Sequence, residues 1–308
     1  MATMTETPVI TGTVTPSHEY HATAHVLSGR LERPIEQKIE EQAPVKLSDR
    51  RGGHLTRSEE DVSIEGLITY TKGHTRVSGS RSLKHNGWVT ISTSIMEGLN
   101  VFEIITADRV VSQVSTDHAY TDHAYEDGHF PRVTFLGTQF TNFQVSGFAP
   151  KVTFKLDICG ERPAGNKSYL QDRVFLDAVR EQTEKIARAA GLPKELKATY
   201  DKRLTYVDEL ISTCETRDPG AHEPITCSLV ESIGEIPIRG VRSFGHVLVI
   251  PEFGTVSLGE VEVGEKQYEK SEKPCVYFEL TGLKMNLGCV GHGSANAATA
   301  KANGHTVP

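Results

Sequence analysis

The stretch VYFELTGLKMNL at residues 276–287 alternates apolar and polar side chains along its length. Apolar residues occupy every second position up to Leu280, and after Gly282 the apolar set shifts by one position and resumes at Leu283. Period-two alternation is typical of a strand with one buried and one solvated face, which antiparallel sheets allow. A glycine at such a change of phase predicts a β-bulge.

Similar strand patterns recur on the N-terminal side of this stretch. Short runs rich in β-branched and aromatic residues are separated by Gly, Pro, Asn and Asp, and they include residues 64–71, 88–93, 101–115, 152–158 and 255–263. Frequent strands with turn signals between them predict a mainly β protein of two packed antiparallel sheets. A partly parallel β-solenoid is the alternative, although the chain has no regular repeat period that favours it.

Residues 169–190 depart from the strand pattern, because their apolar side chains recur at helical spacing with charged residues opposite. Ser168 is a candidate N-cap, and Gly191 followed by Pro193 is a stop signal. A second, shorter helix is expected over residues 194–204. We therefore predict a helical insertion over residues 168–204 that lies against one side or edge of the sheets.

The two ends of the chain lack clear periodicity. Residues 1–19 are rich in Thr, Pro and Glu, and residues 293–308 are small and polar. Because disorder concentrates at termini of this kind, both are expected to be disordered tails. The prediction is a single β-rich domain over residues 20–292.

Composition excludes several classes of protein. The chain has 33 Lys and Arg against 40 Asp and Glu, a net charge of −7 that disfavours general binding to nucleic acid. No apolar run is long enough for a membrane-spanning helix, and no secretory signal is visible. Five widely spaced cysteines fit neither a disulfide framework nor a zinc ribbon. The default expectation is therefore a cytoplasmic protein, with non-classical export or surface association as the alternative.

A tandem duplication, TDHAYTDHAY at residues 116–125, concentrates imidazoles and carboxylates in one segment. Imidazole together with carboxylate suits zinc, manganese or iron. The candidate ligands are Asp117, His118, Asp122, His123, Asp127 and His129. The alternative interpretation is a polar surface loop lengthened by duplication, in which case the chain holds no cofactor.

Two further groups of residues could carry chemistry. His18, His21 and His25 form a second histidine cluster, which we interpret as exposed histidines near a mobile terminus. Cys227 and His246 could act as nucleophile and base if the fold brings them together, although a buried cysteine and a structural histidine are the simpler interpretation. The nucleophile elbow and the glycine-rich phosphate loops are absent from the sequence.

Several of these segments, taken in order, resemble the bacterial choice-of-anchor P type of domain and related bacterial proteins of unknown function. The phrases that carry the resemblance lie at residues 21–29, 87–94, 99–109, 133–147, 250–260 and 280–293. The resemblance implies a β-rich domain, often displayed outside the cell, with no established activity.

Abundant strands without a catalytic signature indicate a structural or binding module rather than an enzyme. Exposed strand edges would allow such a module to self-associate into a homo-oligomer. The alternative is a metal-binding protein or metal-dependent hydrolase that uses the His/Asp loop at residues 117–129.

Overall fold

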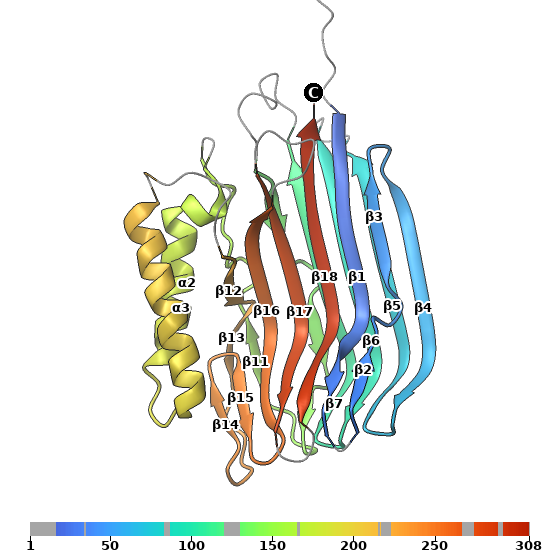
Figure 1. Cartoon of the computed structure of the whole chain (residues 1–308), viewed down its shortest axis with the longest axis vertical. Coiled ribbons are helices and arrows are strands. Elements are labelled where there is room, and N and C mark those ends of the chain that lie inside the picture. The colour runs from blue at the N-terminus through green and yellow to red at the C-terminus, as the bar shows by residue number, and fades with distance from the viewer. Residues whose placement is uncertain are drawn as a thin grey trace, which may run out of the picture.

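The computed structural model describes residues 17–33, 35–82, 87–119, 130–164, 167–214, 216, 223–266, 274–288 and 292–307. Within these residues the chain forms a nine-stranded sheet, a seven-stranded sheet and a two-stranded sheet, each with antiparallel strand pairs. The two large sheets, here called sheet A and sheet B, face one another (Figure 1). The predicted sandwich is confirmed, and the solenoid alternative is wrong.

Sheet A has the order β14-β15-β16-β17-β18-β1-β2, with β12 paired to β16 and β3 paired to β1. Its strands are β1 (Ser17–Leu31), β2 (Gln37–Ile39), β3 (Val45–Asp49), β12 (Ile225–Ser228), β14 (Arg242–Phe244), β15 (Val247–Ile250), β16 (Gly254–Lys266), β17 (Cys275–Leu287) and β18 (Gly293–Val307). The N-terminal and C-terminal strands of the described chain therefore pair at the middle of one sheet.

Sheet B has the order β10-β7-β6-β5-β4, with β8 and β9 paired to β7. Its strands are β4 (Gly53–Ile64), β5 (Ile68–Arg81), β6 (Trp88–Val101), β7 (Ile105–His118), β8 (Arg132–Thr134), β9 (Gln139–Thr141) and β10 (Gln144–Val145). The small sheet pairs β11 (Val152–Phe154) with β13 (Val230–Ile233). Across the sandwich, β18 packs on β6 and β7, and β1 packs on β5 and β6.

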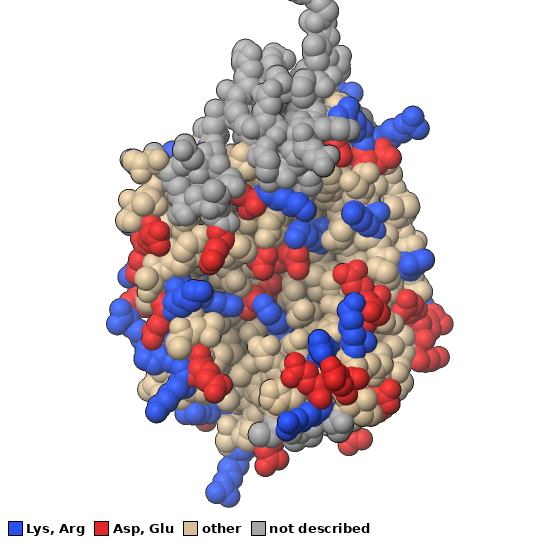
Figure 2. Space-filling model, viewed as in Figure 1, with Lys and Arg blue, Asp and Glu red and all other residues tan. Residues whose placement is uncertain are grey.

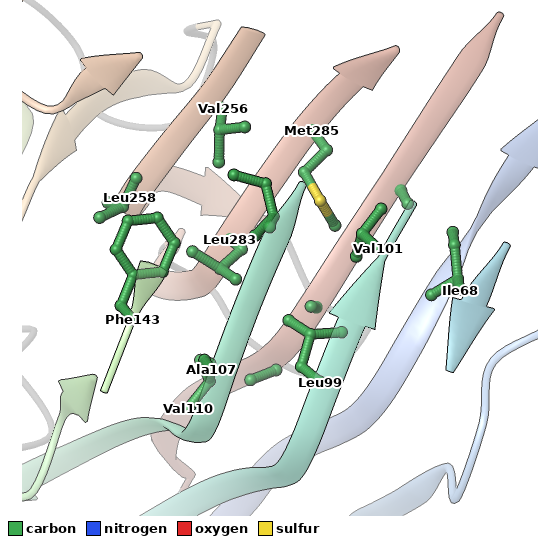
Figure 3. Packing of buried hydrophobic residues seen from close by; sticks show 14 of the residues in the cluster. Ile68, Leu99, Val101, Ala107, Val110, Phe143, Val256, Leu258, Leu283 and Met285 are labelled. Atoms are coloured by element: carbon green, nitrogen blue, oxygen red, sulfur yellow. The ribbon is translucent and has the colours of Figure 1, made fainter. Parts of the chain in front are cut away.

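The core between the sheets consists mainly of aliphatic side chains. Leu258 and Met285 of sheet A belong to the same core cluster as Leu99 and Val101 of sheet B, and Figure 3 shows Met285 close to Val101. All four are at most 2% exposed. Burial of such side chains is the main stabilising contribution to a sandwich of this kind.

The burial pattern of β17 changes phase at Gly282, as predicted, but the predicted β-bulge is not formed there. Glu260 pairs with Thr281 and Leu258 pairs with Leu283, so the register is the same on both sides and no residue is inserted. Gly282 also lies against β7, where an added Cβ would come within 2.8 Å of Val110.

The neighbouring strands explain why the register survives the change of phase. Gly259 on β16 and Ala298 on β18, which flank Gly282, have positive φ angles of 60° and 54°. Strands β16, β17 and β18 therefore bend at the same level of sheet A, where Gly259, Gly282 and Ala298 lie side by side. Side chains on both sides of the bend can then face the core.

The expectation of a disordered C-terminal tail is wrong for residues 293–307, which form β18. This strand lies between β1 and β17. Its inward side chains are small and fully buried, namely Ala295, Ala297, Ala298, Ala300 and Ala302. Alanine is a poor strand former, so the alternation of alanine with polar residues was not interpreted as a strand. At the other end, residues 17–19 belong to β1, while residues 1–16 and 308 lie outside the described residues.

The predicted helical region contains η1 (Tyr169–Gln171), α2 (Arg173–Ala187) and α3 (Lys194–Thr213), so it extends beyond residue 204. Ser168 caps η1, whereas α2 is capped by Asp172, whose carboxylate accepts a hydrogen bond from the Phe175 amide at 3.2 Å. Both helices pack against β12 at one edge of sheet A (Figure 1). None of the described helices combines the length and the apolar character that crossing a membrane would require.

Candidate functional site

The outer face of sheet A carries a groove of about 750 Å³. It runs across β1, β3 and β18, and residues from β16 and β17 also line it. Figure 2 shows acidic and basic side chains mixed over this face. The groove itself is lined by three acidic residues, Glu19, Glu41 and Glu279, and by three lysines. Because polar groups converge in a concavity of this size, the groove is the main candidate binding site.

Strand alternation in β1 decides which of its histidines reach the groove. His18 is 1% exposed and faces the core with Tyr20, whereas His21 and His25 face outward and line the groove. The interpretation of these three residues as exposed histidines near a mobile terminus is therefore wrong, because all three lie within a paired strand. The structure separates His18 from the other two.

A group of potential metal ligands lies at one end of the groove. One ligand atom each from Glu19, His21 and His305 lies within 4.8 Å of the others. His21 Nε2 is 3.2 Å from His305 Nδ1 and 3.9 Å from Glu19 Oε1. The two imidazole rings are stacked, with an interplanar angle of 7°. We call these three residues the Glu19–His21–His305 cluster.

The pairing of β1 with β18 brings the cluster together. Glu19 is directly opposite His305 in this ladder, and His21 is opposite Asn303. His21 therefore lies on the same face as Glu19 and diagonal to His305, within reach of a long side chain. A separation of 284 residues in the chain is closed by the register of one strand pair.

Neighbouring side chains orient two members of the cluster. Ser48 Oγ on β3 lies 3.2 Å from His21 Nδ1, on the opposite side of the ring from His305. Arg50 Nε lies 3.7 Å from Glu19 Oε2, which leaves Oε1 closer to His21. Partners of this kind fix the tautomer and the direction of a metal ligand.

The histidines of the cluster favour the neutral form. Burial lowers the pKa of His21 to about 4. The neighbouring His305, Lys266 and Lys46 also lower this pKa, whereas Glu19 raises it. The pKa of His305 is also lowered, mainly by burial. Because neutral imidazole is the form that binds metal ions, these rings can act as ligands well below neutral pH.

The predicted metal loop is only partly within the described residues. Asp117 and His118 are consecutive on β7, so their side chains point to opposite faces of sheet B and are not brought together. His118 is 1% exposed in the core. Asp122, His123, Asp127 and His129 lie outside the described residues, and the loop site stays a prediction.

His118 belongs to an aromatic cluster inside the sandwich. Its ring lies 4.6 Å from that of His18, which in turn stacks on Trp88 at 5.2 Å. Burial and the neighbouring His118 lower the pKa of His18 well below its ordinary value. Trp88 is a core residue.

A buried ion cluster lies where α3 meets sheet A. Glu260 is 6% exposed, accepts a hydrogen bond from Lys284, and has Arg203 Nη2 at 3.7 Å. Burial alone would raise the pKa of Glu260, but the two cations outweigh it and the pKa is lowered. Tyr200 on α3 and His246 lie beside this group, with Oη and Nε2 3.1 Å apart.

Cys227 and His246 both lie near Glu260, and each is 2% exposed. Burial raises the pKa of the Cys227 thiol to about 12, so the thiolate is inaccessible at neutral pH. Burial lowers the pKa of His246 to about 4, and its Nε2 is engaged by Tyr200. The simpler interpretation of a buried cysteine and a structural histidine is confirmed. Among the described residues, Cys159, Cys214 and Cys227 are buried and form no disulfide.

Sequence reasoning did not identify Glu19 or His305 as site residues. Both lie in segments that were expected to be disordered, and nothing local indicates that β1 pairs with β18. The alternation Glu19-Tyr20-His21-Ala22 was the available signal for β1, because it places the carboxylate and the imidazole on one face.

Comparison with known proteins gives a family without an assigned activity. The model of the family described as a domain of unknown function, DUF8256, matches residues 18–264. The choice-of-anchor P type finds no support in this match. Neither the curated proteins nor the solved structures include a significant match to the chain.

Proposed function

The chain belongs to the DUF8256 family of domains of unknown function, and from its own residues we propose that it is a binding domain that holds a divalent transition-metal ion in the groove of sheet A. The observation that carries the proposal is the convergence of three ligand atoms, from Glu19, His21 and His305, within 4.8 Å of one another. Two imidazoles and one carboxylate form a common ligand set for such an ion.

The distances in the Glu19–His21–His305 cluster agree with a shared ion. In a tetrahedral zinc site with bonds of about 2.0–2.1 Å, neighbouring ligand atoms lie roughly 3.4 Å apart. The His21–His305 distance of 3.2 Å and the His21–Glu19 distance of 3.9 Å bracket that value. The third separation, between Glu19 and His305, is within 4.8 Å, so these two side chains would have to approach each other for all three ligand atoms to reach one ion.

The choice of ion follows from the ligand types. Neutral imidazole favours zinc, copper, nickel and iron over magnesium and calcium, which prefer oxygen ligands. We therefore expect zinc to bind and calcium not to compete with it.

Isothermal titration of untagged, metal-free protein with zinc is expected to show one site. The His21→Ala, His305→Ala double variant should bind zinc more than about 100-fold more weakly, because it removes two of three ligands. His54→Ala is the matched control, since His54 is exposed on β4 outside the groove. It should bind zinc like the unmodified chain.

A second arm of the same titration tests the predicted loop as the metal site. If His123→Ala, His129→Ala abolishes zinc binding while His21→Ala, His305→Ala preserves it, the ion belongs to residues 117–129. Undiminished binding in both double variants would contradict both sites.

The lowered pKa of His21 predicts an unusual pH dependence of zinc affinity. Two imidazoles of ordinary pKa, near 6.5, would each lose about tenfold in affinity at about pH 5.5 through competition with protons. Because the pKa of His21 is about 4 and that of His305 is also lowered, we expect a loss of less than about tenfold between pH 7 and pH 5.5. A loss of about 100-fold over that interval, in titrations at matched ionic strength, would show that the histidines titrate normally.

A further inference from the structure

We infer that the metal-loaded groove binds a small molecule that carries a carboxylate or phosphate group, with one oxygen of that group on the ion. This inference rests on the proposed metal site and names the class of ligand that the site takes. Three protein ligands leave at least one position of a tetrahedral ion free. A metal site of this kind, on the wall of an open groove, can accept a ligand atom from solvent.

The charges around the Glu19–His21–His305 cluster favour an anion once the ion is present. The charged residues that line the groove are Glu19, Glu41, Glu279, Lys46, Lys266 and Lys301, three of each sign. Arg50 adds a positive charge next to Glu19. A divalent cation therefore leaves the metal-loaded groove with an excess of positive charge, and bound ions often dominate the local field.

The positive charges lie on two sides of the cluster. Lys46 is on β3, and Lys266 ends β16. Both are near enough to His21 to act on its ionisation. Lys301, by contrast, is held by Glu279 at 2.8 Å and lies over the ring of Tyr277. Lys46 is thus placed to face the anionic group of a ligand on the ion, and Lys266 adds a second positive charge near the cluster.

A buried hydroxyl in the groove is a second feature that points to a ligand. Thr299 lines the groove and is 5% exposed, and its Oγ1 has no hydrogen-bond partner among the described residues. A buried polar atom without a partner is costly. Thr299 lies six positions from His305 along β18, about 20 Å at the usual rise of a strand, so only a ligand with an extended body could reach both the ion and this hydroxyl. A groove of about 750 Å³ is large enough for a molecule beyond a bare anion.

The test uses cobalt(II), which occupies zinc sites and reports its ligands through its visible absorption spectrum. Full-length protein is first loaded with cobalt and then titrated with acetate in one arm and with methylphosphonate in the other. We expect a saturable spectral change in at least one arm. The arm with the lower half-saturating concentration distinguishes a carboxylate ligand from a phosphate-type ligand.

Two variants test the groove residues, neither of which is a metal ligand. Lys46→Ala should raise the half-saturating anion concentration about fivefold by removing one nearby charge, whereas Thr299→Val should leave it unchanged, because acetate and methylphosphonate on the ion are too short to reach that hydroxyl. Both should leave cobalt affinity within about twofold of the unmodified chain. Lys202→Ala is the control, because Lys202 is exposed on α3.

The outcomes separate this inference from the proposed function. If cobalt binds and neither anion changes its spectrum, the anion inference is overturned while the metal site stands. If the anions act equally on the unmodified chain and on Lys46→Ala, the anion contacts only the ion and the groove has no part in recognition, which also overturns the inference. If cobalt does not bind, the proposed function and this inference fail together.

Discussion

A chain that ends at residue 292 is expected not to fold. The deletion removes β18, which pairs along its length with both β1 and β17 at the middle of sheet A. It also removes the contacts that β18 makes with β6 and β7 of sheet B. The two remaining parts of sheet A would each expose a long edge and an apolar face. That loss is comparable with the whole stability of a domain, which is about 5–15 kcal/mol.

Circular dichroism and thermal unfolding measure this result. The truncated chain should show no cooperative transition, whereas the full-length chain should show one. Lys301→Ala is the matched control inside β18, because it keeps the strand and loses only the partly exposed ion pair with Glu279 and the contact with the Tyr277 ring. Its cost should be below about 2 kcal/mol. A cooperative transition in the truncated chain would mean that β18 is not part of the folded core.

Replacement of Glu260 by alanine is expected to destabilise the protein by about 3 kcal/mol. Glu260 is the anion between Arg203 of α3 and Lys284 of β17. Removing one partner of a buried ion cluster leaves the opposite charges uncompensated, which typically costs about 3–5 kcal/mol. The lower end applies here because Arg203 and Lys284 are 27% and 39% exposed and can turn toward water.

Urea unfolding at neutral pH gives the difference in free energy. Glu260→Gln should cost less than Glu260→Ala, because the amide oxygen can still accept a hydrogen bond from Lys284. Glu231→Ala is the control, since Glu231 is exposed on β13. If Glu260→Ala changes the free energy of unfolding by no more than this control does, the ion cluster does not hold α3 on the sheet.

Much of the fold could be predicted from the sequence because alternation reports burial directly. The pattern around Gly282 predicted an inward-facing strand on both sides of the glycine, and β17 has that form. The row of bends through Gly259 and Ala298 could not be predicted, because it depends on which strands are neighbours. The helices were predicted because the charged and apolar faces of residues 173–187 are well separated.

The candidate site was harder to predict than the fold. His21 was noticed as part of a histidine cluster, but its true neighbours, Glu19 and His305, come from the two ends of the described chain. Pairing between distant strands leaves no local signal. The expected self-association stays a prediction, and one edge at which it could occur is β4, the longest of the described strands that pair with a single neighbour.

X-ray absorption at the zinc edge, on full-length protein with one equivalent of zinc, tests the central claim most directly. We predict that the zinc ion is surrounded by nitrogen and oxygen atoms at about 2.0–2.1 Å, and that the spectrum also contains the outer-shell scattering of two imidazole rings. His21→Ala, His305→Ala should lose that imidazole signal. An imidazole signal that is unchanged in this double variant would place the ion elsewhere and contradict a metal site in the groove of sheet A.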